Sequence, residues 1–276
     1  MNHVWTLAGL TIKEAVRRRV FFASMLVALI FVLFAVLPLH IGRGTEGVEL
    51  DAAREFSAKT LAWMGCGVIK FFGSVLAVTL AAGAITAEVD RGVLSIVAPK
   101  PLPRAAIYLG KWIGLLALLA VSVALWSVLL VGAIYIHTHL FYPRIFLGIL
   151  ATFLFPLLFA TLTLCFSSFA THALSAGLAL IAAGVALAED TLNFLSIMLN
   201  APVLKSLSTL VGYIVPLGKM NHWITRGLGD AGNDLSARNP LGAQAVHTST
   251  GDMAYILFYI AAALAIGLFI FQKRDL

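Results

Sequence analysis

Three charged residues lie deep inside long apolar runs of this 276-residue chain. Lys70 lies within the run 61–87, and Glu189 and Asp190 interrupt a run that begins near residue 173. A charge near the centre of a bilayer costs at least about 2.5–3.5 kcal/mol, so such residues usually face a protein interior or a water-filled path. One interpretation is a cargo or ion site, with a Lys70–Glu189 pair. The other is that the carboxylates cap their span at the outer interface while the Lys70 ammonium reaches toward that interface.

A second set of polar groups suggests metal binding only weakly. His137 and His139 form a His-x-His pair, and imidazole is a common ligand of transition metals. Two alternating ligands do not complete a site, so both are interpreted as polar interface residues and no metal or other cofactor is predicted. No nucleophile–base set is visible, and no Gly-x-x-x-x-Gly-Lys-Ser/Thr loop is present that would bind a nucleotide.

The most informative polar segment is the connection 88–111. It starts with two carboxylates and a glycine, and three prolines then fall within five positions, Pro99, Pro101 and Pro103. Proline fixes φ and cannot continue a helix, so this connection is predicted to be stiff. A stiff, charged segment between two apolar runs suits the docking of a partner and the transmission of force. The alternative is an ordinary connection between helices.

The composition identifies the elements that must position these groups. Hydrophobic residues make up 61% of the chain and charged residues 12%, against about 45–50% and 25% in soluble domains. A chain this apolar excludes a soluble enzyme, a disordered protein and a fibrous repeat. The net charge of +6 is attributed to basic cytoplasmic flanks rather than to nucleic-acid binding. Cys66 and Cys165 are interpreted as small apolar core residues.

The prediction is an all-α polytopic membrane protein with a single transmembrane domain. Six apolar runs are long enough to span a bilayer, at about 20–39, 61–87, 112–136, 145–171, 173–199 and 254–271. An amphipathic interfacial helix over 1–19 precedes them, with Trp5 as its anchor. The outer segment 200–253 is expected to form re-entrant or interfacial helices. Basic residues flank three segments on one side, which places both termini in the cytoplasm.

This pattern resembles the type-2 ABC transporter permeases. In that family a cytoplasmic loop between the second and third spans contacts the ATPase. The positions of this chain that match the loop pattern are Glu88, Asp90, Gly92, Pro101, Arg104, Gly110 and Lys111. The N-terminal helix, with Trp5, Lys13, Glu14 and Arg17, resembles the family's elbow helix. Within the family the chain is most similar to the permeases grouped with Nos-type and multi-copper-enzyme-maturation transporters.

The resemblance implies a permease subunit that forms the substrate pathway of an exporter in the bacterial cytoplasmic (inner) membrane. Its expected partners are membrane lipid, a second and identical permease subunit, and two cytosolic ABC ATPase subunits that bind ATP and magnesium. The chain itself is then not an enzyme. An ion-coupled secondary transporter is the alternative, but it requires inverted repeats and committed buried charges, and no convincing repeat is visible. An intramembrane enzyme lacks the necessary residue set, and the cargo is not predicted.

Overall fold

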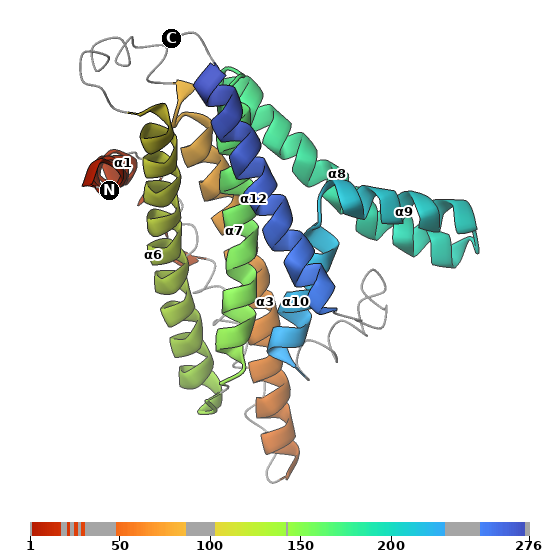
Figure 1. The fold of residues 1–276 in the computed structure, drawn as a ribbon. Helices are drawn as coiled ribbons and strands as arrows, with labels where there is room; N and C mark the ends of the chain where they lie inside the picture. Colours follow the sequence, from red (N-terminus) through yellow and green to blue (C-terminus); the bar gives the residue numbers. More distant parts are fainter. Residues whose placement is uncertain are drawn as a thin grey trace.

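Every regular element that the structure describes is a helix (Figure 1). The structure is a computed structural model, and the residues that it describes are 2–17, 21–22, 25–26, 29–30, 48–86, 103–141, 143–229 and 249–273. Within these ranges the predicted all-α class is confirmed. The helices are α1 (Asn2–Arg17), α3 (Val48–Ala82), α6 (Arg104–Thr138), α7 (Ile145–Ser167), α8 (His172–Met198), α9 (Pro202–Ile214), α10 (Leu217–Leu228) and α12 (Thr250–Lys273).

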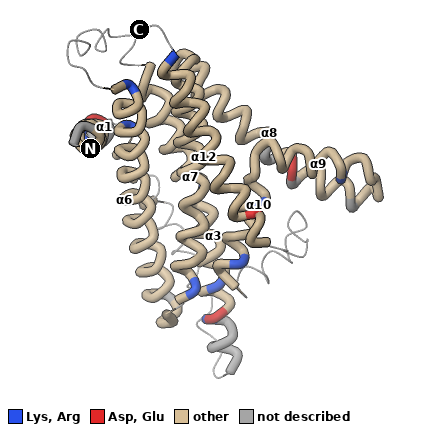
Figure 2. Tube along the Cα trace, in the orientation of Figure 1, with Lys and Arg blue, Asp and Glu red and all other residues tan. Residues whose placement is uncertain are grey.

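Four of these helices form an elongated bundle of α3, α6, α7 and α12 (Figure 1). At one end of the bundle, called here the proximal end, α3 ends, α6 begins and α12 ends. At the opposite, distal end, α6 ends while α7 and α12 begin. Lys and Arg residues lie at both ends, and long uncharged stretches separate them (Figure 2).

Four segments of the described chain are long and apolar enough to cross a membrane. They are Arg54–Ala82, Arg104–Ile136, Ile145–Ser167 and Thr250–Lys273, and they correspond to the second, third, fourth and sixth predicted spans. The predicted first span, 20–39, lies mostly outside the described residues. The predicted fifth span corresponds to α8, in which the apolar stretch His172–Val185 is shorter than a full span. The count of six spans therefore stays a prediction.

Two helices begin earlier than the apolar runs suggested. Helix α3 starts at Val48, well before the predicted span 61–87, because most of the polar residues before the apolar run are good helix formers. The ammonium of Lys59 also lies 3.1 Å from the Glu55 carboxylate one helical turn away. Helix α6 starts at Arg104, directly after Pro103, so only residues 88–103 of the predicted connection 88–111 precede the helix, and they are called the loop 88–103 below. The ends of an apolar run therefore do not mark the ends of its helix.

Helix α7 is the central element of the bundle. It contacts α3, α6, α8, α10 and α12, and its Leu158, Ala160 and Leu164 are completely buried. A helix that is apolar on all sides belongs in the interior of such a bundle. The outer helices instead expose large apolar side chains, among them Val128 and Phe258 at 71% each. An apolar outer surface of this kind fits a lipid environment.

Helices α8 and α9 form a hairpin that extends away from the bundle (Figure 1). The chain then returns to the bundle through α10, which packs on the distal half of α7. Two glycines make this contact close. A Cβ atom on Gly227 would lie 2.8 Å from the backbone nitrogen of Gly148. Helices α9 and α10 both lie in the segment 200–253, where re-entrant or interfacial helices were expected.

Candidate functional site

The carboxyl end of α3 is bonded by side chains from three other helices. The Ala82 carbonyl accepts hydrogen bonds from Ser167 Oγ (3.0 Å) and from Ser175 Oγ (3.3 Å). The Ala84 carbonyl accepts one from Lys111 Nζ. The last carbonyls of a helix have no partner within the helix, so these contacts join α3 to α7, α8 and α6 next to the last residues described before position 103.

Lys111 is the most unusual member of this group because its charged side chain is only 5% exposed. An ammonium so deeply buried needs polar partners. The carbonyls at a helix C-terminus carry a partial negative charge that favours a cation. Lys111 belongs to the second turn of α6, whereas Ala84 follows the last turn of α3. The residue therefore connects the two helices that flank the predicted coupling loop in the sequence.

Arg104 makes a further link at the same end. It is the first residue of α6, and its Nη1 atom donates a 3.0 Å hydrogen bond to the carbonyl of Gln272 near the end of α12. A guanidinium at this position also matches the negative end of the α12 dipole. The amino-terminal part of α6 thus contacts the carboxyl ends of both α3, through Lys111, and α12, through Arg104.

Helix α1 rests on a notch in α6 made by two glycines four residues apart. A Cβ atom on Gly110 would lie 2.7 Å from Leu7 Cβ, and one on Gly114 would lie 2.8 Å from the Ala8 carbonyl oxygen. Small residues at this spacing let two helix backbones approach closely. The apolar stripe predicted for α1 faces this notch, since Ala8 is 4% exposed. The other side of the helix carries Trp5, which is 66% exposed.

We refer to these joined helix ends as the proximal hub. Its residues are Ala82, Ala84, Arg104, Gly110, Lys111, Gly114, Ser167, Ser175 and Gln272. Of the loop residues singled out in the sequence, the hub contains Arg104, Gly110 and Lys111, whereas Glu88, Asp90, Gly92 and Pro101 lie outside the described residues. Lys13 and Glu14 of α1 are exposed, and Arg17 is the last residue of that helix.

Sequence reasoning missed Ser175 of the hub. A serine in an apolar helix usually bonds the backbone of its own or a neighbouring helix, as Ser167 does, and nothing in the local sequence indicates which helix end either serine reaches. Gly114 was also missed, although its position four residues after Gly110 was a usable signal for a close helix contact.

Two of the charged residues inside the apolar runs, Lys70 and Glu189, each contact α10 instead of forming the pair considered from the sequence. Lys70 Nζ donates a 2.9 Å hydrogen bond to Asn221 Oδ1 and lies 5.0 Å from the centre of the Phe155 ring. The Glu189 carboxylate accepts a 3.3 Å hydrogen bond from the Gly218 backbone nitrogen in the first turn of α10. Both residues thus hold α10, one from α3 and the other from α8. The side chain of Asp190 lies outside the described residues.

The Glu189 carboxylate also explains why positions 212 and 218 are glycines. A Cβ atom on Gly212 of α9 or on Gly218 of α10 would overlap the carboxylate oxygens. A carboxylate at a helix N-terminus is favoured by the helix dipole and by the unpaired N–H groups there. In the described part of the chain, no group of three or more His, Cys, Asp or Glu is placed to hold a metal ion.

The contact between Lys70 and Asn221 leads to a thermodynamic prediction. Replacing Asn221 with leucine removes the amide acceptor of a partly buried ammonium and is expected to lower the free energy of unfolding by about 1.5–3 kcal/mol. The double variant Lys70→Met with Asn221→Leu should recover a large part of that loss, because the ammonium is then absent. Denaturation midpoints in detergent of the wild type, the two single variants and the double variant measure the coupling energy between Lys70 and Asn221. Purely additive effects would contradict the assigned pair.

Comparison with known protein families places this geometry in context. A family model described as ABC-2 family transporter protein matches residues 5–276. The chain belongs to the ABC-2 transporter family. No individual curated protein sequence matches it. The ABC-2 chain is therefore a multi-pass membrane protein and a membrane component of a transporter, and permeases of this kind work with ATPase subunits. The hub of this ABC-2 permease lies at both ends of the loop that resembles the ATPase-contacting loop of the family.

Proposed function

We propose that this ABC-2 chain is the permease subunit of an exporter and that a cytosolic ATPase drives it through the loop 88–103. The single observation that supports this most strongly is the proximal hub. Lys111 bonds the end of α3, and Arg104 bonds the end of α12. A force applied to the loop would therefore reach α3, α6 and α12 together instead of being absorbed by one helix.

The contacts of the hub also extend this coupling to the remaining proximal elements. Helix α1 is seated on Gly110 and Gly114, and α7 and α8 are bonded to the end of α3 through Ser167 and Ser175. The sub-ångström shifts that a partner imposes on a packed junction are transmitted because such junctions are not continuously deformable. This arrangement supports a rigid-body movement of the bundle in response to ATP-driven closure of the partner.

The ion-coupled alternative gains no support from the charged residues within the apolar runs. Such a mechanism needs a committed buried site whose occupancy changes during transport. Lys70 and Glu189 instead hold α10 through Asn221 and Gly218. These contacts support a structural role for the two charges.

The assembly that we propose contains two copies of this chain and two ATPase subunits that bind ATP and magnesium. Each copy has six spans, an interfacial α1 and re-entrant or interfacial helices α9 and α10, with both termini in the cytoplasm of a bacterial cell and the proximal end facing the cytosol. The positive-inside pattern supports this orientation. Membership in the Nos-type subgroup remains part of the proposal.

The test is purification of the tagged chain from native membranes with its partners. We expect an ATPase that contains a phosphate-binding loop to co-purify, with two copies of each subunit by native mass spectrometry. Replacing Arg104 with glutamate should reduce the retained ATPase at least about tenfold, because a like charge then meets the end of α12. The matched control is Arg54→Glu at the opposite end of α3, which should retain the ATPase fully. Transport by the purified chain on an ion gradient alone would overturn the proposal.

A further inference from the structure

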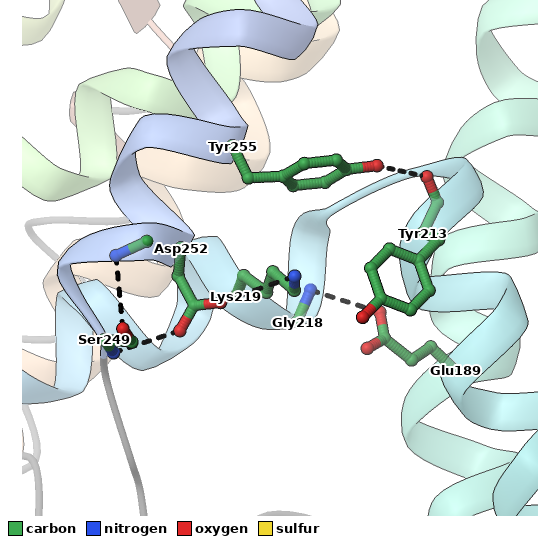
Figure 3. A network of polar contacts seen from close by, with 8 residues as sticks. Glu189, Tyr213, Gly218, Lys219, Ser249, Asp252 and Tyr255 are labelled. Carbon is green, nitrogen blue, oxygen red and sulfur yellow. Dashed lines mark hydrogen bonds and ion pairs between the residues drawn. The ribbon is translucent and has the colours of Figure 1, made fainter.

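A lysine, a carboxylate and two tyrosines from three helices meet at the distal end of the bundle (Figure 3). The Lys219 Nζ atom lies 4.7 Å from the centre of the Tyr213 ring and 4.5 Å from the centre of the Tyr255 ring. It also lies 3.3 Å from Asp252 Oδ1. The two rings stand at 89° to each other with their centres 5.9 Å apart. Two perpendicular aromatic walls and a carboxylate are the components of sites that recognise alkylammonium groups.

We call Tyr213, Tyr255 and Asp252 the aromatic cage. The walls of this cage are held by contacts that do not involve Lys219. The Tyr255 hydroxyl donates a 2.6 Å hydrogen bond to the Tyr213 carbonyl at the end of α9, which orients its ring. The other Asp252 oxygen, Oδ2, accepts a 3.0 Å hydrogen bond from the Ser249 backbone nitrogen at the start of α12. The cage is therefore preorganised, and it should keep its shape when the lysine is absent.

Lys219 is a displaceable occupant for an electrostatic reason. It lies in the first turn of α10, which begins at Leu217, and the positive end of a helix dipole disfavours a cation. A free ammonium ligand could take the same position without being tied to that helix end. The cage is also reachable from outside, because the side chains of Lys219 and Asp252 are 24% and 23% exposed and Tyr213 is 55% exposed.

We infer that Tyr213, Tyr255 and Asp252 form a binding site for alkylammonium groups that the chain's own Lys219 fills in this conformation. A ligand that takes the place of Lys219 also breaks the ion pair between α10 and α12. The ligand is either a free organic cation or the ammonium headgroup of a lipid, since both present the same chemistry. The inference concerns binding to this chain alone and does not depend on ATP-driven transport.

The first test removes the Lys219 side chain beyond Cβ and supplies the missing atoms as a soluble compound. Lys219→Ala removes three methylene groups and the ammonium, which n-propylammonium replaces, and 1-propanol is its uncharged isostere. We expect propylammonium to raise the Tm of the Lys219→Ala protein and to bind it at least about tenfold more tightly than wild type, in which the tethered lysine competes. Propanol should have no such effect, and adding Asp252→Asn should abolish the binding.

The matched control for this test is Lys205→Ala, which removes an exposed lysine from α9. This variant should bind propylammonium no better than wild type. The inference is wrong if propanol stabilises Lys219→Ala equally well, if Lys205→Ala gains the same affinity, or if a folded Lys219→Ala protein binds nothing.

A second test uses the wild-type protein and does not depend on the folding of a variant. In phosphatidylglycerol nanodiscs, tetramethylammonium should displace Lys219 and at least double its rate of acetylation relative to sodium chloride at equal ionic strength. The rate at Lys205, measured in the same digest by mass spectrometry, should not change. A rise when phosphatidylcholine replaces part of the lipid identifies a headgroup as a ligand, whereas a rise with tetramethylammonium alone identifies a free cation. No rise with either would overturn the inference.

Discussion

Replacing Lys111 with methionine is expected to leave the chain in the membrane while strongly reducing its coupling to the ATPase. Methionine retains an unbranched stem, but it removes the ammonium that bonds the Ala84 carbonyl at a site only 5% exposed. Losing a hydrogen bond from a charged group costs about 1.5–3 kcal/mol. A change of about 2 kcal/mol shifts an equilibrium about thirtyfold. We therefore expect most of the permease-dependent stimulation of ATP hydrolysis to be lost, measured in proteoliposomes that contain both subunits.

The control for this variant is Ser122→Ala, which removes a buried polar group from α6 outside the hub. The Ser122 hydroxyl donates its hydrogen bond to the Leu118 carbonyl of its own helix, so the expected effect is about 1 kcal/mol or less. ATP hydrolysis should then remain close to the wild-type level. Equal coupling in the Lys111→Met and wild-type proteins would show that the bond between α6 and α3 carries no force.

A methyl group added at Gly114 should detach α1 from the bundle. In Gly114→Ala the new Cβ would lie 2.8 Å from both the Ala8 carbonyl oxygen and Thr11 Cβ. A backbone oxygen cannot rotate away, so α1 itself must move. Overpacking of this kind typically costs about 1–3 kcal/mol. We expect a lower Tm and faster proteolysis within the N-terminal segment, with a larger effect when Gly110→Ala is added.

Two glycines on the same helices serve as matched controls. No atom lies within 4 Å of a Cβ built on Gly132 of α6 or on Gly9 of α1. Alanine is favoured over glycine within a helix by about 0.5–1 kcal/mol, so both substitutions should leave the Tm unchanged or raise it. If Gly114→Ala behaved like Gly132→Ala, α1 would not be seated on α6 as described.

Some features of the site were accessible from the sequence and others were not. Arg104, Gly110 and Lys111 could be singled out because they match the loop pattern of the family that the sequence resembles. The hydrogen-bond partners of Lys111 and Lys70 could not be predicted from the sequence. The Lys70–Asn221 bond joins residues 151 positions apart, and a residue pattern along the chain contains no information about such a distance. The sequence suggested a Lys70–Glu189 pair. In the structure each of these residues makes a separate contact with α10.

The sequence by itself determined the membrane class and the approximate positions of four spans. These properties are sums over neighbouring residues, because hydropathy acts locally. The stiffness of residues 88–103 stays a prediction from proline geometry. Only the tertiary structure decided which helix ends meet in the hub, where α1 rests and how Lys219 fills the cage beside Tyr255. Those arrangements depend on how helices with similar apolar surfaces pack against each other, and small residues and single polar groups select one packing among many.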